Sequence, residues 1–255
     1  MHKFLDVLVE NLLLDNAKLV QLLLSGRATL PDAIGFCQNY RLAGIGALLL
    51  SGTSRDFRSR LDASGRAYAH FLRSSPEDAK LGSQAGPFFD ALAAGATETA
   101  REIAQLARHS HCAGEEYEED FLFPETLMQA FFLGATRDAC EALLVQWQAA
   151  LQGTDDPRLD ACGALIARDT RAFDGALRMV LTSWEVLTER LAETNRAAPE
   201  VLETEGQVSV EGLALVRLAE SLGMATEEEY PGIPSTAREN GPLGAAPDAW
   251  QRPQG

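Results

Sequence analysis

Basic residues and histidines are scarce in this chain of 255 residues. Lys and Arg number 22 against 37 Asp and Glu, which gives a formal net charge of -15, and there are four histidines. Binding DNA or RNA through the phosphate backbone needs a positive surface, so the composition excludes a nucleic-acid-binding protein of that kind. An acidic surface instead suits a basic protein, whose approach it would steer.

Long hydrophobic runs are also missing. The longest, Leu42–Leu50, falls far short of the roughly 20 apolar residues that a membrane span requires. Asp6, Glu10 and Asp15 interrupt the apolar N-terminal stretch, whereas a secretory signal needs an unbroken apolar region. We therefore expect a cytoplasmic protein that does not enter a membrane.

Motifs that carry known chemistry are absent. The sequence has no Walker loop, no GxGxxG, no GxSxG and no HExxH. Its cysteines lie singly, without a CxxC pair, and we interpret them as small buried residues in a reducing compartment. They are Cys37, Cys112, Cys140 and Cys162. We predict no catalytic residues, no cofactor and no enzymatic activity.

His109, His111 and Cys112 form a short His-Ser-His-Cys cluster. A structural zinc site needs about four ligands in a compatible arrangement, and the spacing of the other cysteines does not complete one. We interpret the cluster as a polar loop and predict no metal site.

Apolar residues recur at helical spacing along almost the whole chain, which predicts an all-α fold of about ten helices. The first helices are expected over residues 4–24, 31–50 and 56–72. Gly44 and Gly46 should mark close packing of the second helix. The third helix is rich in arginine, and we interpret these side chains as an exposed face: Arg55, Arg58, Arg60, Arg66 and Arg73.

Three similar turns predict stacked helical hairpins. Gly95-Ala96-Thr97, Gly134-Ala135-Thr136 and Arg168-Asp169-Thr170 each follow an apolar helix end and precede a new amphipathic helix. They recur 39 and 34 residues apart, which is the period of tetratricopeptide-like repeats. Gly would cap the preceding helix, and Thr would accept a hydrogen bond at the start of the next.

The last two helices should form much of the core. The stripe on residues 170–194 is about seven turns long, and the helix near 208–222 is apolar almost all round, so it belongs in the middle of the fold. We predict that the following residues are largely buried: Trp147, Phe173, Leu177, Trp184, Leu213 and Leu218. We expect one helical domain over residues 1–230 and a disordered Pro- and Gly-rich tail over 231–255.

The densest acidic segment lies before another predicted helix. It consists of Glu115, Glu116, Tyr117, Glu118, Glu119 and Asp120. Carboxylates are favoured at a helix N-terminus, so a solvated helix start is one interpretation. Five carboxylates in six residues exceed what a cap needs, which favours a surface for a basic partner. A site for a hard cation is a third interpretation, although no EF-hand spacing supports it.

Several segments together resemble the immunity protein 49 family of bacterial polymorphic toxin systems. In order, they are Gly86–Gly95, Glu115–Phe121, Phe131–Gly134, Val210–Glu220 and Glu229–Pro234. The resemblance covers about residues 40 to 236. It implies a mostly helical fold, a gene beside a toxin gene, and neutralisation of that toxin inside the producing cell.

The resemblance directs attention to two acidic segments as partner-binding sites. One is Glu115–Asp120, and the other consists of Glu227, Glu228, Glu229 and Tyr230. The expected partner is a cognate toxin, basic in charge. Two alternatives stay open. A helical-repeat adaptor would present a concave peptide groove, and a helical enzyme would show a pocket with convergent polar groups and shifted pKa values.

Overall fold

A computed structural model describes residues 4–243 and 246–253, and within them it contains eleven α-helices and no β-strand. The prediction of an all-α fold is confirmed. The helices are α1 (Leu5–Leu24), α2 (Leu30–Ser51), α3 (Ser54–Ser74), α4 (Gly86–Ala94), α5 (Thr97–Leu106), α6 (Glu118–Phe131), α7 (Arg137–Ala150), α8 (Pro157–Ala167), α9 (Thr170–Glu193), α10 (Pro199–Leu202) and α11 (Val210–Ser221). Three short 3-10 helices are η1 (Glu77–Ala79), η2 (Ser235–Arg238) and η3 (Ala249–Gln251).

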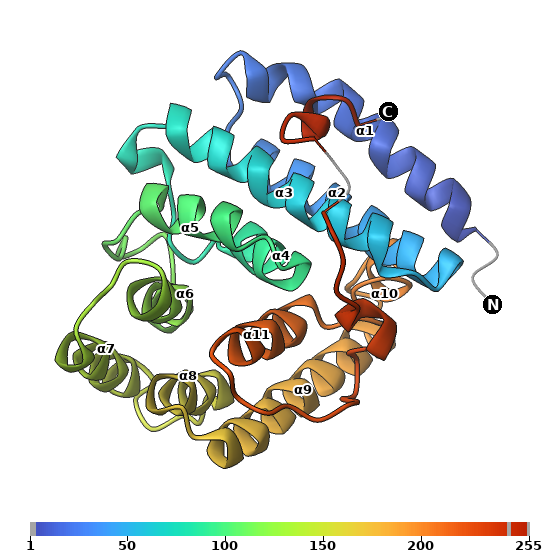
Figure 1. Cartoon of the computed structure of the whole chain (residues 1–255). Coiled ribbons are helices and arrows are strands. Elements are labelled where there is room, and N and C mark those ends of the chain that lie inside the picture. The colour runs from blue at the N-terminus through green and yellow to red at the C-terminus, as the bar shows by residue number, and fades with distance from the viewer. Residues whose placement is uncertain (1–3, 244–245, 254–255) are drawn as a thin grey trace.

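Helix α2 lies between α1 and α3 at the N-terminal end of the fold (Figure 1). Thr29 and Asp32 form a reciprocal capping box at its start, and Gly52 ends it in the left-handed conformation. A Cβ atom at Gly46 would lie 2.6 Å from a methyl carbon of Val9, so α1 packs directly on the α2 backbone. The predicted role of the α2 glycines in close packing is thereby confirmed.

The three predicted hairpin turns join α4 to α5, α6 to α7 and α8 to α9. Gly95 and Gly134 have φ values of 73°, and Arg168 takes the same left-handed conformation with φ 55°. The predicted threonine caps are only partly right. Thr136 caps α7. Thr97 and Thr170 are instead the first residues of α5 and α9. Ala96 precedes α5 and offers no side-chain acceptor, whereas the Asp169 carboxylate caps α9 by accepting from the Ala172 amide.

The hairpins curve into an incomplete ring, and α11 lies inside that ring (Figure 1). It packs against α4 on one side and α9 on the other. Gly212 permits the second contact, since a Cβ atom there would lie 2.6 Å from Leu181. A single cluster of buried apolar side chains extends from Val20 to Trp250, so the helices share one main core.

Five of the six predicted core residues are buried, and the sixth is partly exposed. Trp147, Phe173, Leu177 and Leu213 have no exposed surface, and Leu218 is also buried. Trp184 is half-buried, so it lies at the edge of the core. The apolar stripe of α9 is covered by neighbouring helices up to Leu181, and beyond that point it borders a surface groove.

The described part of the C-terminal segment is packed against the helices, so the prediction of a disordered tail is wrong for residues 231–243 and 246–253. Residues 244–245 and 254–255 lie outside the described residues. Trp250 anchors the segment with 4% of its surface exposed. It lies against Phe36 and His70, and Tyr40 donates a hydrogen bond of 3.0 Å to its carbonyl oxygen. One large aromatic residue outweighs a composition typical of disorder.

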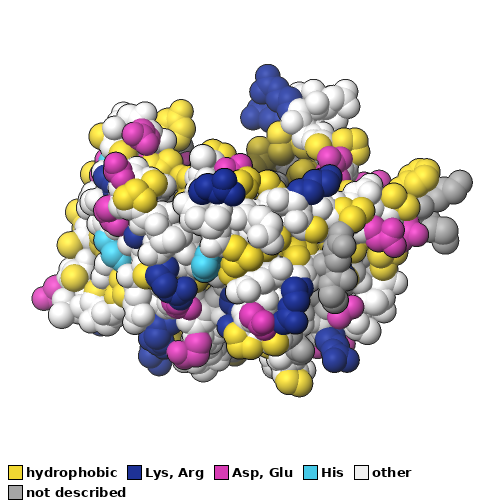
Figure 2. Space-filling model, turned by 90° about the horizontal axis from the view of Figure 1, so that it is seen from above, with side chains coloured by type: hydrophobic (Ala, Val, Ile, Leu, Met, Phe, Trp, Pro, Cys, Tyr) yellow, Lys and Arg dark blue, Asp and Glu magenta, His cyan; other side chains and the backbone are white. Residues whose placement is uncertain are grey.

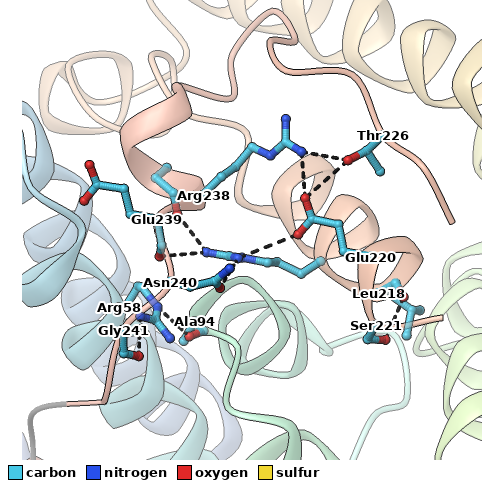
Figure 3. Close-up of polar contacts among 12 residues, drawn as sticks. Arg58, Ala94, Leu218, Glu220, Ser221, Thr226, Arg238, Glu239, Asn240 and Gly241 are labelled. Carbon is cyan, nitrogen blue, oxygen red and sulfur yellow. Dashed lines mark hydrogen bonds and ion pairs between the residues drawn. The ribbon is translucent and has the colours of Figure 1, made fainter. Parts of the chain in front are cut away.

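Two buried arginines bind another part of the same C-terminal segment, next to α11 (Figure 3). Arg58 of α3 donates to the carbonyl oxygens of Ala94 and Gly241, at 2.9 and 2.7 Å. Arg217 of α11 donates to the Asn240 side chain at 2.7 Å. The prediction that the α3 arginines form an exposed face is therefore wrong for Arg58, which is buried.

Replacing Leu177 with Ala should lower the free energy of unfolding by about 2–5 kcal/mol, because the side chain is fully buried between helices. Leu187→Ala on the same helix is the matched control. Leu187 is 55% exposed, and we expect its replacement to cost less than about 1 kcal/mol. Chemical denaturation measures both. Equal effects would mean that the observed orientation of α9 is wrong.

Replacing Trp250 with Ala should lower the free energy of unfolding by about 3–5 kcal/mol, because it removes a buried aromatic anchor. The neighbouring Gln251→Ala should have little effect, since Gln251 is half-buried and makes no side-chain hydrogen bond among the described residues. A Trp250→Ala variant as stable as the native chain would show that the segment does not pack in solution.

Candidate partner-binding groove

The acidic segment 115–120 lies at the start of α6, as predicted. Glu118, Glu119 and Asp120 occupy the first helical turn, where the free backbone amides favour negative charge. Glu115 is exposed and Tyr117 is 74% exposed. These side chains are accessible to a partner, and the helix start explains why the structure accommodates their charges.

Glu116 has a different role from its neighbours. Its carboxylate accepts hydrogen bonds from the backbone amides of Ser83 and Cys112, at 2.8 and 2.9 Å. It therefore holds two loops together beside α6. Glu118 is also engaged, because Gln146 of α7 donates to it at 2.8 Å. Sequence alone did not separate these structural carboxylates from the free ones.

The second predicted segment, 227–230, lies in the loop after α11 and packs on α9. Tyr230 is only 5% exposed, and its hydroxyl donates to Asp174 at 3.0 Å. Glu227 pairs with Arg178 of α9, whereas Glu228 and Glu229 are exposed. Tyr230 thus fastens the loop to the core and has little surface to offer a partner.

The structure does not bring the two acidic segments into one site. Instead, three adjoining hollows link the start of α6 with α8, α9, α11 and α2. The first, of about 570 Å³, is lined by Glu119, Asp120, Asp155, Asp156, Arg158 and Glu211 together with apolar side chains. The second, of about 230 Å³, shares Trp184, Leu187, Ser209 and Glu211 with the first. The third, of about 270 Å³, shares Arg41 and Glu205 with the second. We call these hollows together the acidic groove.

Helix N-termini explain why carboxylates gather here. The first residues of α4, α6 and α8 all line the groove, so the N-termini of these three helices lie at its border. The N-terminus of α11 joins them within the groove. Asp156 caps α8, and Glu211 lies in the first turn of α11. The partial positive charge of each terminus stabilises these carboxylates.

Arg41 ties the floor of the groove to the core. Its Nε donates to Asp90 at 2.6 Å, and its Nη1 donates to Glu205 at 3.0 Å. Asp90 is fully buried and also accepts a hydrogen bond of 2.5 Å from Ser64. Gly86 lets the guanidinium reach this position, because a Cβ atom there would lie 2.7 Å from it.

Arg158 makes a similar connection at the other end. It donates to Asp156 at 2.8 Å and to Asp120 at 3.2 Å, and its guanidinium lies 5.2 Å from the centre of the Phe123 ring. Both arginines of the groove thus already have two carboxylate partners each. Their positive charge is largely neutralised within the protein.

Three groove carboxylates have no such partner. Within the described residues, Glu119, Asp155 and Glu211 make no side-chain hydrogen bond or close ion pair. Burial raises the pKa of Glu211, an effect that the positive charge of Arg158 partly opposes. Burial likewise raises the pKa of Asp90, which the contact with Arg41 opposes. Six carboxylates and two arginines line the three hollows, so acidic side chains outnumber basic ones in the groove.

Trp184 forms an apolar wall beside this charge. Its ring lies against Gly232, where any side chain would overlap it, and Gly232 has φ +67°. The Gly232 carbonyl oxygen accepts a hydrogen bond of 2.8 Å from the Ser209 amide at the start of α11. The segment from Glu229 to Pro234 therefore positions the groove wall from behind.

The model of the family described as immunity protein 49 matches residues 50–237, about three quarters of the chain. The chain belongs to the immunity protein 49 family. The match includes α4 to α11 and the Tyr230 loop, whereas Arg41 lies before it. No curated protein and no solved structure matches the chain.

The described part of this immunity protein 49 family member contains no helix long and apolar enough to span a membrane. It also contains no group of three or more His, Cys, Asp or Glu side chains placed to hold a metal ion. His109 instead lies 2.7 Å from the buried Glu125 carboxylate, which raises the pKa of the imidazole. His111 lies 3.0 Å from the Glu116 carbonyl oxygen.

Sequence reasoning missed most of the groove in this family member. It singled out Glu119 and Asp120 but not the carboxylates just before α8, just after α10 and in the first turn of α11. The missed groove residues are Arg41, Asp155, Asp156, Arg158, Glu205 and Glu211. The one local signal was Asp156-Pro157, a typical helix start, which places a carboxylate at the N-terminus of α8.

Replacing Arg41 with Ala should lower the free energy of unfolding by about 3–5 kcal/mol, because Asp90 would stay buried without its cationic partner. The exposed Arg171 on α9 is the control, and Arg171→Ala should change stability by less than about 0.5 kcal/mol. Urea denaturation gives both values. Similar small effects would show that the Arg41–Asp90 pair does not hold the groove floor.

Proposed function

We propose that this chain is an immunity protein that binds a cognate bacterial toxin in the cytoplasm of the producing cell and neutralises it through protein–protein contact. The observation that carries the proposal is the acidic groove, in which three carboxylates are unpaired within the described residues beside an uncovered apolar wall. Membership of the immunity protein 49 family supports it. The net charge of -15 favours a basic toxin as the partner.

The groove has the mixed character of a protein interface. Apolar groups form the centre of many interfaces, and charged groups at the rim set orientation and association rate. Trp184 and Leu187 supply the apolar part, and Glu119 and Asp155 lie toward the rim. An interface of standard size buries about 800 Å² on each partner, so it would extend beyond the groove to Tyr117 and Glu115.

Charge is less one-sided on the face that lies uppermost in Figure 1. On the face seen in Figure 2, basic and acidic side chains are interspersed with apolar ones. A basic toxin would therefore be drawn less strongly to that face. This contrast supports the groove as the point of approach.

The two alternatives have less support. A helical-repeat adaptor would use the inner surface of its hairpins, but α11 fills that surface here. An enzyme would need a group with a shifted pKa that can reach a substrate, and the pKa of Asp90 below the groove is raised. However, Asp90 is fully buried and bound by Arg41 and Ser64, so it is not placed to meet a substrate.

Reversing two rim charges, with Glu119→Lys and Asp155→Lys together, should slow association with the toxin at least about tenfold and weaken protection of the cell. The dependence of the association rate on salt should fall as well, since the steering charges are screened by ions. Stopped-flow binding and a toxin survival assay measure these effects with the toxin encoded beside the gene.

The matched control is the pair Glu185→Lys and Glu189→Lys, which changes the net charge equally on exposed positions of α9 outside the groove. This control should leave the association rate within about threefold of the native rate, because charges near the binding site affect that rate more than the net charge of the whole protein does. If both double variants slow association equally, the groove is not the site at which the toxin binds. Full toxin activity in the presence of the native chain would overturn the proposed function itself.

A further inference from the structure

The two larger hollows of the acidic groove meet at a junction formed by Trp184, Leu187, Ser209 and Glu211. Two helices supply it. Trp184 and Leu187 come from α9, Ser209 precedes α11, and Glu211 belongs to the first turn of α11. The junction thus combines an aromatic wall, an apolar edge and one carboxylate in a single recess.

Glu211 is the unusual member of this group. It is half-buried, and within the described residues no donor reaches its carboxylate. The nearby guanidinium groups are those of Arg41 and Arg158, and each is already bound by two other carboxylates. A half-buried carboxylate without a hydrogen-bonded partner costs stability, and the start of α11 offsets only part of that cost.

Trp184 suits a cation with an extended apolar stem. It is half-buried, so part of its ring borders the recess, and Gly232 fixes the ring from behind. A guanidinium packs over an indole more favourably than over other rings, and it can also bind a carboxylate with two parallel hydrogen bonds. Lysine offers the charge but lacks the planar fork.

We infer that the junction between Trp184 and Glu211 receives one arginine side chain of the partner, with its stem along Leu187 and its guanidinium on the Glu211 carboxylate. This inference rests on the proposed function, because it names the group of the toxin that the groove recognises. Glu119 and Asp155 steer the approach, and Glu211 provides the specific contact.

The uncovered apolar residues of α9 favour a protein segment over a free cation as the ligand. Leu187 is 55% exposed, and with Leu191 it continues the lining of the second hollow beyond Trp184. An amphipathic segment that carries the arginine would cover them at the same time. A metal ion would gain nothing from this apolar border.

The test uses the full chain and a short, blocked amphipathic peptide with arginine on its polar face. Two further peptides carry lysine or uncharged citrulline at the same positions. Isothermal titration should give the tightest binding for arginine. The indole resonance of Trp184, assigned with Trp184→Phe, should shift on binding.

Glu211→Gln keeps the size of the side chain and removes its charge. We expect it to weaken binding of the arginine peptide at least about tenfold, because a half-buried charge pair is lost. The control Glu189→Gln removes one charge from an exposed position on α9, and it should change affinity less than twofold. Circular dichroism and thermal unfolding establish that both variants are folded.

Equal affinity in the Glu211→Gln and Glu189→Gln variants, or equal binding of the arginine and citrulline peptides, would overturn the inference. Failure of the proposed function looks different, since the native chain would then not protect against the toxin encoded beside its gene. Protection that persists unchanged in Glu211→Gln would leave the function intact and remove the arginine site.

Discussion

Burial of α11 is the constraint on which the rest of the structure depends. Leu213, Leu215 and Val216 are fully buried, and the helix is covered on nearly every side. Hairpins stacked in an open array would leave their inner apolar faces in water. Inserting one apolar helix removes those faces from solvent at about 25 cal/mol per Å² of apolar surface. The curvature of the hairpins and the packing of α4 against α11 follow from this arrangement.

The buried helix also explains the C-terminal segment. Arg217 is a charged residue on α11, and its buried guanidinium needs acceptors. The segment supplies the Asn240 side chain and the carbonyl oxygens of Ala237 and Glu239, while Glu220 approaches to 3.7 Å. Figure 3 shows this segment running from Arg238 past Asn240 to Gly241, whose carbonyl oxygen accepts a hydrogen bond from Arg58. The tail is therefore needed to satisfy the polar part of a mostly apolar helix.

Sequence patterns predicted the features that depend on neighbouring residues, namely the helices and the turns between them. Helical periodicity gave the helices and their class, and the Gly-containing turns located the hairpins within a residue or two. The central position of α11 followed from its apolar composition. Patterns did not reveal that Arg41 would meet Asp90, 49 positions away, or that Trp250 would dock on α2. Such pairs depend on the final arrangement of elements, which short-range periodicity does not encode.

Tertiary contacts also decide which acidic residues are free to bind a partner. Carboxylates at 115–120 stood out by density, yet Glu116 is occupied by backbone amides and Tyr230 of the second segment is in the core. Glu211 did not stand out, because it is one of only two acidic residues in a mostly apolar helix. What distinguishes it is its position between two arginines that are already paired. A helix N-terminus stabilises nearby negative charge by about 0.3–1 kcal/mol, which offsets part of the cost of keeping such a carboxylate unpaired. A cationic partner that pairs with it gains the full contact, because no internal bond has to be broken first.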